Sequence, residues 1–209
     1  MTPYSGTSNK INNKINNVKL AGTLISFGAS YFVLCLIVAE ALHDGYSISR
    51  NYISELGVGS TALIFNSSTF ILGATIFGGA YLLRKSMKGR ILPRLLMTSG
   101  IGCMGTALFP YTLGIIHILF SIMAFASGIL AIFTSCKLLT PPVKYIYLWL
   151  GMTSLAAFIL FTIGEVSIRF FNVSLNLAIG LGGMERMIVY PVLIWALSFG
   201  GFLYGSEIG

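Results

Sequence analysis

The sequence predicts an all-α membrane protein, a polytopic bundle of about six transmembrane helices whose N- and C-termini are both cytoplasmic. Of its 209 residues, 56% are hydrophobic and only 9% are charged, whereas about 25% of the residues of a soluble domain are charged. The apolar residues form continuous runs of about 20, which is the length of a helix that crosses a bilayer. Strands of a membrane barrel would alternate apolar and polar residues, so these runs predict helices.

Six apolar runs mark the expected helices, and basic or helix-breaking residues separate them. The second run stops at a basic cluster that begins at Arg84, and the third ends at Pro110. The fourth run stops before the Pro141-Pro142 pair. Residues 1–19 are polar and rich in Asn and Lys, so we expect a cytoplasmic N-terminal segment followed by one transmembrane domain over residues 20–209. The expected spans are 20–39, 62–83, 91–108, 112–136, 145–164 and 186–204.

Lysine and arginine are distributed unequally between the two ends of the expected bundle. The end that is richer in them is cytoplasmic by the positive-inside rule, which predicts a multi-pass protein of the cell membrane. Such clusters also attract anionic lipid head groups, so the net charge of +7 indicates a membrane surface and no nucleic acid as the partner. Only Arg50, Arg169 and Arg186 fall at the opposite, outer end. The cytoplasmic residues are Lys10, Lys14, Lys19, Arg84, Lys85, Lys88, Arg90, Arg94, Lys137 and Lys144.

Nearly all the other ionisable residues, five of the six acidic ones among them, gather at the outer end of the expected bundle, and Glu207 is the acidic exception. His117 is expected about one and a half turns inside the fourth helix, and Glu165 at the end of the fifth. Ionisable groups at membrane depth usually face the bundle interior and pair with one another. Arg186 would begin the sixth helix, where the helix dipole opposes it, so we expect a carboxylate partner from Glu165 or from the first loop. The outer acidic residues are Glu40, Asp44, Glu55, Glu165 and Glu185.

The first outer loop contains a predicted short helix over residues 49–57. Ser49 suits the N-cap position, and Gly57 suits the position after the last turn. Asn51 and Glu55 would share one face of this helix, because residues four apart are neighbours on a helix surface. We expect that face to cover the mouth of the bundle.

Several short motifs resemble those of the DUF998 family of membrane proteins. The resemblance implies six spans and one outer site that joins Ser54, Glu55, His117, Glu185 and Arg186. The family is in turn distantly similar to the Frag1/DRAM/Sfk1 group, which includes lipid-remodelling and GPI-anchor maturation factors. An Asp more often stands in the family pattern where this chain has Glu55. The motifs are Ile53-Ser54-Glu55-Leu56-Gly57 after the first span, His117, and Gly183-Met184-Glu185-Arg186 at the opening of the last span.

The favoured function is the binding of a lipid head group or another small polar ligand at the outer end. Arginine forms paired hydrogen bonds with phosphate, so the outer arginines are suited to hold one. A structural network of ion pairs that fixes the loops would use the same residues. The candidate ligand-binding residues are Arg50, Asn51, Ser54, Glu55, His117, Glu165, Arg169, Glu185 and Arg186.

Catalysis on a lipid, by a membrane-embedded hydrolase or transferase, is the first alternative. His43, Asp44 and His117 are the candidate metal ligands, but no HExxH pattern is present and the adjacent His43 and Asp44 cannot easily turn to one ion. We therefore predict no metal and no other cofactor, haem included. A metal-free acid–base site that uses His117 and Glu55 is equally open, because histidine titrates near neutral pH.

A role as accessory subunit of a larger membrane complex is the second alternative, with another membrane protein or a second copy of the chain as partner. A transporter or channel is disfavoured, because the middles of the spans carry no ionisable residue and such pathways usually contain some. The cysteines lie in apolar runs without CxxC spacing, which indicates buried, inert thiols. Residues 172–174 match a glycosylation acceptor at the outer end.

Overall fold

The computed structural model describes residues 4–87, 89–171 and 179–206, and these ranges fold into helices without any β-strand. Six of the helices are long and apolar enough to cross a membrane, which confirms the predicted all-α bundle of six spans. Lys88 and the glycosylation triplet at 172–174 lie outside the described residues. The elements in chain order are α1 (Tyr4–Leu42), η1 (Ile53–Gly57), η2 (Gly59–Thr61), α2 (Ala62–Ser86), α3 (Ile91–Leu108), η3 (Tyr111–Leu113), α4 (Ile115–Ser135), η4 (Cys136–Leu138), α5 (Val143–Phe171) and α6 (Gly180–Gly205).

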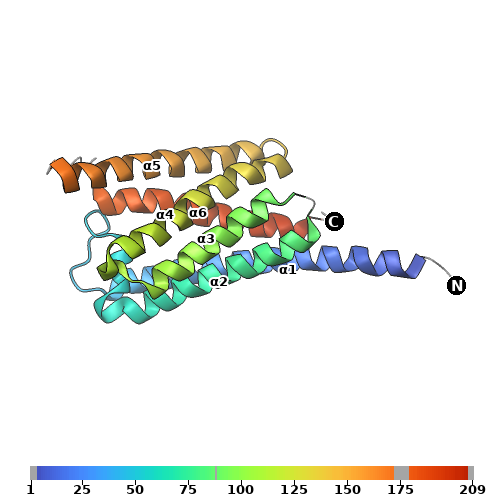
Figure 1. Cartoon of the computed structure of the whole chain (residues 1–209), viewed down its shortest axis with the longest axis horizontal. Coiled ribbons are helices and arrows are strands. Elements are labelled where there is room, and N and C mark those ends of the chain that lie inside the picture. Colours follow the sequence, from blue (N-terminus) through green and yellow to red (C-terminus); the bar gives the residue numbers. More distant parts are fainter. Residues whose placement is uncertain (1–3, 88, 172–178, 207–209) are drawn as a thin grey trace.

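The long helices alternate in direction, so the bundle has two distinct ends (Figure 1). One end, here called the basic end, holds the start of α1, the α2–α3 and α4–α5 connections and the close of α6. All described Lys and Arg residues that were predicted to be cytoplasmic lie toward it. The other end, here called the loop end, holds residues 43–61, residues 109–114, the close of α5 and the start of α6.

Three helices extend beyond the predicted spans because charged residues end an apolar run without ending a helix. The polar residues before position 20 continue α1 back to Tyr4. The fifth helix continues past Glu165 to Phe171, and the sixth begins at Gly180. A polar or charged residue lowers the hydropathy of a segment but leaves its backbone hydrogen bonds intact, so the end of an apolar run does not mark the end of the helix. Glu165 therefore lies inside α5, and Arg186 lies in the second turn of α6, not at its first residue.

The fourth helix begins later than predicted, because Gly114 interrupts the run that starts at position 112. This glycine has a φ of +55°, a backbone conformation that side-chain-bearing residues rarely adopt. The residues before it form the separate 3-10 turn η3. His117 consequently lies in the first turn of α4, close to the loop end.

The predicted 49–57 helix is shorter than expected, since the structure forms only the 3-10 helix η1 from Ile53. The carbonyl groups of Ile48, Ser49 and Asn51 accept hydrogen bonds from α6. A carbonyl that faces α6 cannot accept the N–H four residues later in its own segment. Contacts with α6 therefore hold residues 48–51 as a turn and let helical structure begin only afterwards.

Glycines bring α2, α3 and α4 close together, whereas α4 and α5 separate toward the loop end. A Cβ on Gly100 would meet the backbone of α2, and one on Gly102 would meet Ala124 of α4. Near the basic end, Gly151 of α5 packs against the ring of Phe133 of α4. Farther along, the two helices diverge (Figure 1). This divergence opens the bundle at the loop end.

Candidate functional site

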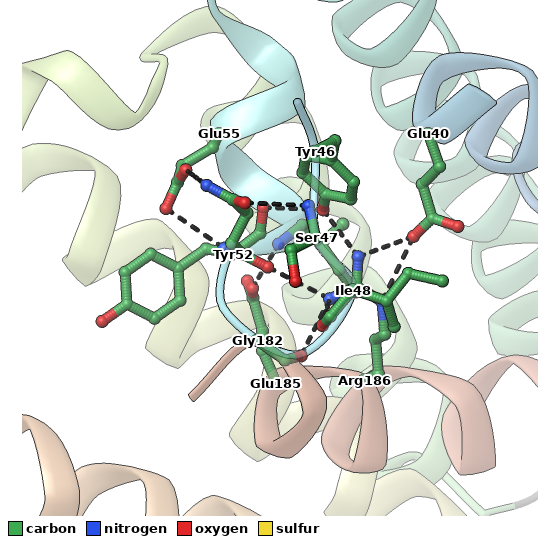
Figure 2. A network of polar contacts seen from close by, with 11 residues as sticks. Glu40, Tyr46, Ser47, Ile48, Tyr52, Glu55, Gly182, Glu185 and Arg186 are labelled. Atoms are coloured by element: carbon green, nitrogen blue, oxygen red, sulfur yellow. Dashed lines mark hydrogen bonds and ion pairs between the residues drawn. The ribbon is translucent and has the colours of Figure 1, made fainter. Parts of the chain in front are cut away.

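Arg186 anchors the end of α1 and the loop after it onto α6 (Figure 2). The residue is only 3% exposed. Its Nη2 and Nε donate to Oε1 of Glu40 at 2.6 and 3.2 Å, respectively. Nη2 also donates to the hydroxyl of Tyr46 at 2.6 Å, and this hydroxyl donates onward to the carbonyl of Tyr52 at 2.9 Å. A buried ion pair of this kind fixes three segments against one another.

The remaining donors of Arg186 bind backbone carbonyls. Nη1 lies 2.8 Å from the oxygen of Ile48, 3.2 Å from that of Asn51 and 2.9 Å from that of Gly182. The N–H of Gly182 donates to the carbonyl of Ser49 at 3.1 Å. Because a guanidinium has five N–H donors and each nitrogen is engaged, Arg186 holds the loop and has no donor left for a ligand.

Glu55 fixes the start of η1. Its Oε2 accepts a hydrogen bond from Asn51 Nδ2 at 2.6 Å, and its Oε1 accepts one from the N–H of Tyr52 at 3.1 Å. Asn51 Oδ1 in turn accepts the N–H of Ser47 at 2.9 Å. The expected proximity of Asn51 and Glu55 is confirmed, although a turn and not a helix brings them together.

Glu185 of α6 also binds the loop between α1 and α2. Its Oε2 accepts the N–H of Ile53 at 2.5 Å, and the residue is only 6% exposed. No described residue donates a hydrogen bond to its second oxygen, Oε1, and no described Lys or Arg forms an ion pair with it. An ionisable group that is buried in a membrane protein without an ion-pair partner among the described residues is a candidate for a functional site.

Glu165 joins α5 to the loop. The hydroxyl of Tyr52 donates to its Oε1, and Nε of Arg169, one turn farther along α5, lies 3.5 Å from its Oε2. Burial raises the pKa of Tyr52 well above its ordinary value, and the hydrogen bond to the Glu165 carboxylate raises it further. The hydroxyl of Tyr52 therefore remains a donor throughout the neutral pH range.

His117 projects from the first turn of α4 and is 6% exposed. Its Nδ1 lies 2.7 Å from the carbonyl oxygen of Phe109. A carbonyl can only accept, so Nδ1 carries the proton and Nε2 of the neutral ring is left as an acceptor. The ring of Tyr111 stands edge-on to the imidazole, with centroids 6.2 Å apart.

A pocket of about 390 Å³ lies between α4 and α5 at the loop end. The rings of Phe125 and Phe158, with centroids 6.4 Å apart, line it where the two helices approach. Its polar lining includes Tyr52, Ser54, Tyr111, His117, Glu165, Arg169 and Glu185. Its apolar lining includes Ile115, Ile118, Ile122, Phe158, Phe161 and Phe170. Its volume falls within the range of small-molecule sites, which are about 300–1,000 Å³.

The structure brings together five of the nine candidate site residues, and it places the other four outside the pocket. Asn51 and Glu55 form the neighbouring hydrogen-bonded turn. Arg186 is directed at Glu40. Arg50 is exposed and forms no ion pair with a described residue. Those that line the pocket are Ser54, His117, Glu165, Arg169 and Glu185.

Arg186 has the carboxylate partner that was expected from Glu165 or the first loop, and the partner is Glu40, which the structure places in the last turn of α1. Sequence reasoning did not include Glu40 among the site residues, although an acidic residue next to an apolar run needs a partner. It also missed the aromatic part of the pocket. The aromatic side chains of Tyr111, Phe158 and Phe161 carry no comparable signal, because aromatic residues are common in membrane helices and at their ends.

The candidate metal ligands do not come together. His43 Nδ1 lies 3.0 Å from the hydroxyl of Thr61, whereas His117 lines the pocket between α4 and α5. Among the residues that the structure describes, no three His, Cys, Asp or Glu side chains are close enough to hold one metal ion.

Comparison with protein families matches residues 26–201 to the model described as "Protein of unknown function (DUF998)". The matched range contains the loop of residues 43–61, all the pocket-lining residues and the whole of α2, α3, α4 and α5. It begins within α1, at residue 26, and ends near the close of α6, at residue 201. Searches of curated proteins and of solved structures find no match.

Proposed function

This chain belongs to the DUF998 family, and we propose that its pocket binds one amphiphilic molecule, a lipid, with the polar head at the loop end and the hydrocarbon chain between α4 and α5. The observation that carries the proposal is the division of the pocket lining. Its carboxylates, its imidazole, its guanidinium and the hydroxyl groups of Ser54 and Tyr111 lie toward the loop end. Toward the middle of α4 and α5 the lining is mostly apolar, with Ile122, Phe125 and Phe158. The two hydroxyl groups in that part, of Ser121 and Thr162, donate to carbonyl groups of their own helices.

The polar groups of the pocket are suited to hold a head group because several lack a partner among the described residues. The hydroxyl groups of Ser54 and Tyr111 form no hydrogen bond to a described residue. Oε1 of Glu185 likewise accepts no hydrogen bond from a described residue. These residues line the pocket, so a bound head group can form hydrogen bonds with them.

The hydrocarbon part of a lipid has a route into the pocket from the side. Ile115, Ile122 and Phe170 line the pocket and are also exposed on the outside of the bundle. In a membrane-spanning segment such exposed apolar side chains face lipid tails. A chain in the bilayer therefore reaches the pocket between α4 and α5 without crossing water.

The pocket belongs in the outer leaflet on this proposal. The Lys and Arg residues concentrate at the basic end, opposite the pocket. The end with this concentration is cytoplasmic by the positive-inside rule, so the loop end faces outward in the cell membrane. The lipid would then be one that reaches the outer leaflet.

Photolabelling tests lipid binding at this place. A phospholipid with a diazirine in its acyl chain is added to the purified chain in nanodiscs, and labelled peptides are mapped by mass spectrometry. We expect labelling of the pocket faces of α4 and α5 that unlabelled lipid competes away. Ile122→Trp fills the pocket and should reduce this competed labelling severalfold. Leu119→Trp is the matched control, because Leu119 is exposed on α4 but does not line the pocket.

Two results would contradict the proposal. Labelling spread evenly over all lipid-facing helices would indicate only contact with bulk bilayer. Equal labelling of the Ile122→Trp and Leu119→Trp proteins would show that the pocket is not the site of binding.

A further inference from the structure

The polar end of the pocket is acidic, and this charge indicates which class of head group it accepts. Apart from the phenols of Tyr52 and Tyr111, its titratable lining groups are two carboxylates, Glu165 and Glu185, one imidazole, His117, and one guanidinium, Arg169. The carboxylate of Glu55 lies next to the pocket, where it binds Asn51 and the N–H of Tyr52. Carboxylates therefore outnumber cations around the head-group position.

Arg169 is already paired with one of these carboxylates. Its Nε lies 3.5 Å from Glu165, and 56% of its side chain is exposed. An exposed pair of this kind is weak and is screened by salt. Its positive charge is balanced by Glu165, so it does not neutralise the second carboxylate of the pocket, that of Glu185.

Glu185 has no cation of its own in the described part of the chain. Its neighbour Arg186 is bonded to Glu40, Tyr46 and backbone carbonyls. The only described donor to Glu185 is the N–H of Ile53. None of residues 172–178 is basic. A carboxylate that is more than nine-tenths buried, accepts one hydrogen bond from the described residues and lines a pocket has a place for a cationic ligand group.

Aromatic rings line the same pocket as Glu185. The ring of Tyr52 lies 5.8 Å from that of Tyr111 and 5.9 Å from that of Phe161, measured between centroids, and all three rings line the pocket. Aromatic faces attract ammonium groups, most strongly where water is excluded. Carboxylate and rings together form a site that is suited to an ammonium ion and unsuited to an anionic head.

We propose, on the basis of the amphiphile binding argued above, that the bound molecule carries an ammonium group. This group lies against the Glu185 oxygen that accepts no hydrogen bond from a described residue, and against the rings of Tyr52 and Tyr111. Two kinds of amphiphile have this chemistry. One is a zwitterionic phospholipid with an amine in its head group, and the other is a single-chain long-chain amine.

Head-group competition in nanodiscs tests this inference. The probes are phosphatidylethanolamine, its N-acetyl derivative, phosphatidylglycerol with the same acyl chains, and dodecylamine, each competing with the photolabel described above. The N-acetyl derivative keeps the phosphate and loses only the ammonium charge. We expect phosphatidylethanolamine to compete about tenfold more effectively than the N-acetyl derivative and phosphatidylglycerol. Competition by dodecylamine as well would identify the amine itself as sufficient, whereas its failure would identify the zwitterionic phospholipid.

Variants link the preference to Glu185. Glu185→Gln should lower competition by phosphatidylethanolamine to the level of its N-acetyl derivative, whereas Asp44→Asn, which changes an exposed acid outside the pocket, should keep the difference between the two lipids. Should Glu185→Gln fail to fold, the comparison of the N-acetyl lipid with its parent on the unchanged protein decides. Equal or better competition by phosphatidylglycerol overturns the ammonium inference and leaves lipid binding intact. Failure of every probe to compete overturns both proposals.

Discussion

Glu185 and Arg186 are neighbours in the chain, yet their side chains have separate environments and separate roles. Arg186 pairs with Glu40 at 2.6 Å and holds the loop between α1 and α2. Glu185 accepts only the N–H of Ile53 from the described residues and lines the pocket. Successive residues on a helix point about 100° apart. One turn of α6 therefore supplies both Arg186, which anchors the loop, and Glu185, which lines the pocket.

Removal of the Arg186 guanidinium should destabilise the protein strongly. Arg186→Met leaves the Glu40 carboxylate buried without a cation and several carbonyl oxygens without a donor, which costs about 3–5 kcal/mol. For a chain of this size we expect the midpoint of thermal unfolding in detergent to fall by on the order of 10 °C. Arg186→Lys should recover only part of the loss, because an ammonium has three donors in place of five.

The matched control for this change is Arg50→Met, because Arg50 is exposed and forms no ion pair with a described residue. It should alter the stability by less than about 0.5 kcal/mol. Adding Glu40→Gln to Arg186→Met should restore stability by removing the orphaned charge. An Arg186→Met protein as stable as the Arg50→Met protein would show that the anchor contributes nothing.

A methyl group at Gly182 should push the loop away from α6. A Cβ at this position would overlap the carbonyl oxygen of Asn51 and crowd that of Ile48, and both are backbone atoms that cannot rotate away. We expect Gly182→Ala to lower the unfolding midpoint and to increase hydrogen exchange of residues 47–53. Gly201→Ala in the same helix is the control, since nothing lies within 4 Å of its Cβ position. It should be neutral or stabilising by about 0.5–1 kcal/mol.

The fold was predictable from sequence because its main determinants are local. Apolar runs of bilayer length specify the helices, and α3 begins and ends at the predicted residues, Ile91 and Leu108. The misjudged boundaries have two physical causes. Charged residues end a hydrophobic run but continue a helix, as in α1, α5 and α6. A single positive φ at Gly114 divides the fourth run, and that angle leaves no trace in the hydropathy.

Several residues of the candidate site were predictable from the sequence, but the direction in which each side chain points was not. The concentration of ionisable residues at one level of the membrane correctly indicated that several of them meet, and His117, Glu165 and Glu185 do line one pocket. Which way each side chain points depends on its azimuth around the helix and on tertiary contacts. For that reason the expected partner of Arg186 included Glu165, whereas the structure assigns Glu40.

The orientation in the membrane predicts a difference in labelling between the two ends. In a chain whose Cys35, Cys103 and Cys136 are replaced by Ala, a cysteine at Asp44 should react with a membrane-impermeant maleimide on intact cells. A cysteine at Gly89 should react only after permeabilisation. Both positions are exposed, and a Cβ at Gly89 meets nothing within 4 Å. The reverse pattern would place the pocket in the inner leaflet and refute the outward orientation.

Alkaline pH should weaken the loop anchor through Tyr46, which lies outside the membrane-spanning segments. Burial raises the pKa of its hydroxyl from 10.0 to about 12. Below pH 10 the hydroxyl is protonated in both the folded and the unfolded chain, and its full contribution to stability is present. Between pH 10 and 12 the unfolded chain ionises more readily than the folded one, so the stability that Tyr46 contributes is lost as pH rises.

Unfolding midpoints measured from pH 9 to 12 should therefore decline more steeply for the unchanged protein than for Tyr46→Phe. The two differ in level as well, because the variant also loses the hydrogen bond to Arg186, and the slope is the diagnostic quantity. Tyr145→Phe, a change at an exposed tyrosine near the basic end, should keep the steep slope, and parallel curves for all three proteins would exclude Tyr46 as the titrating group.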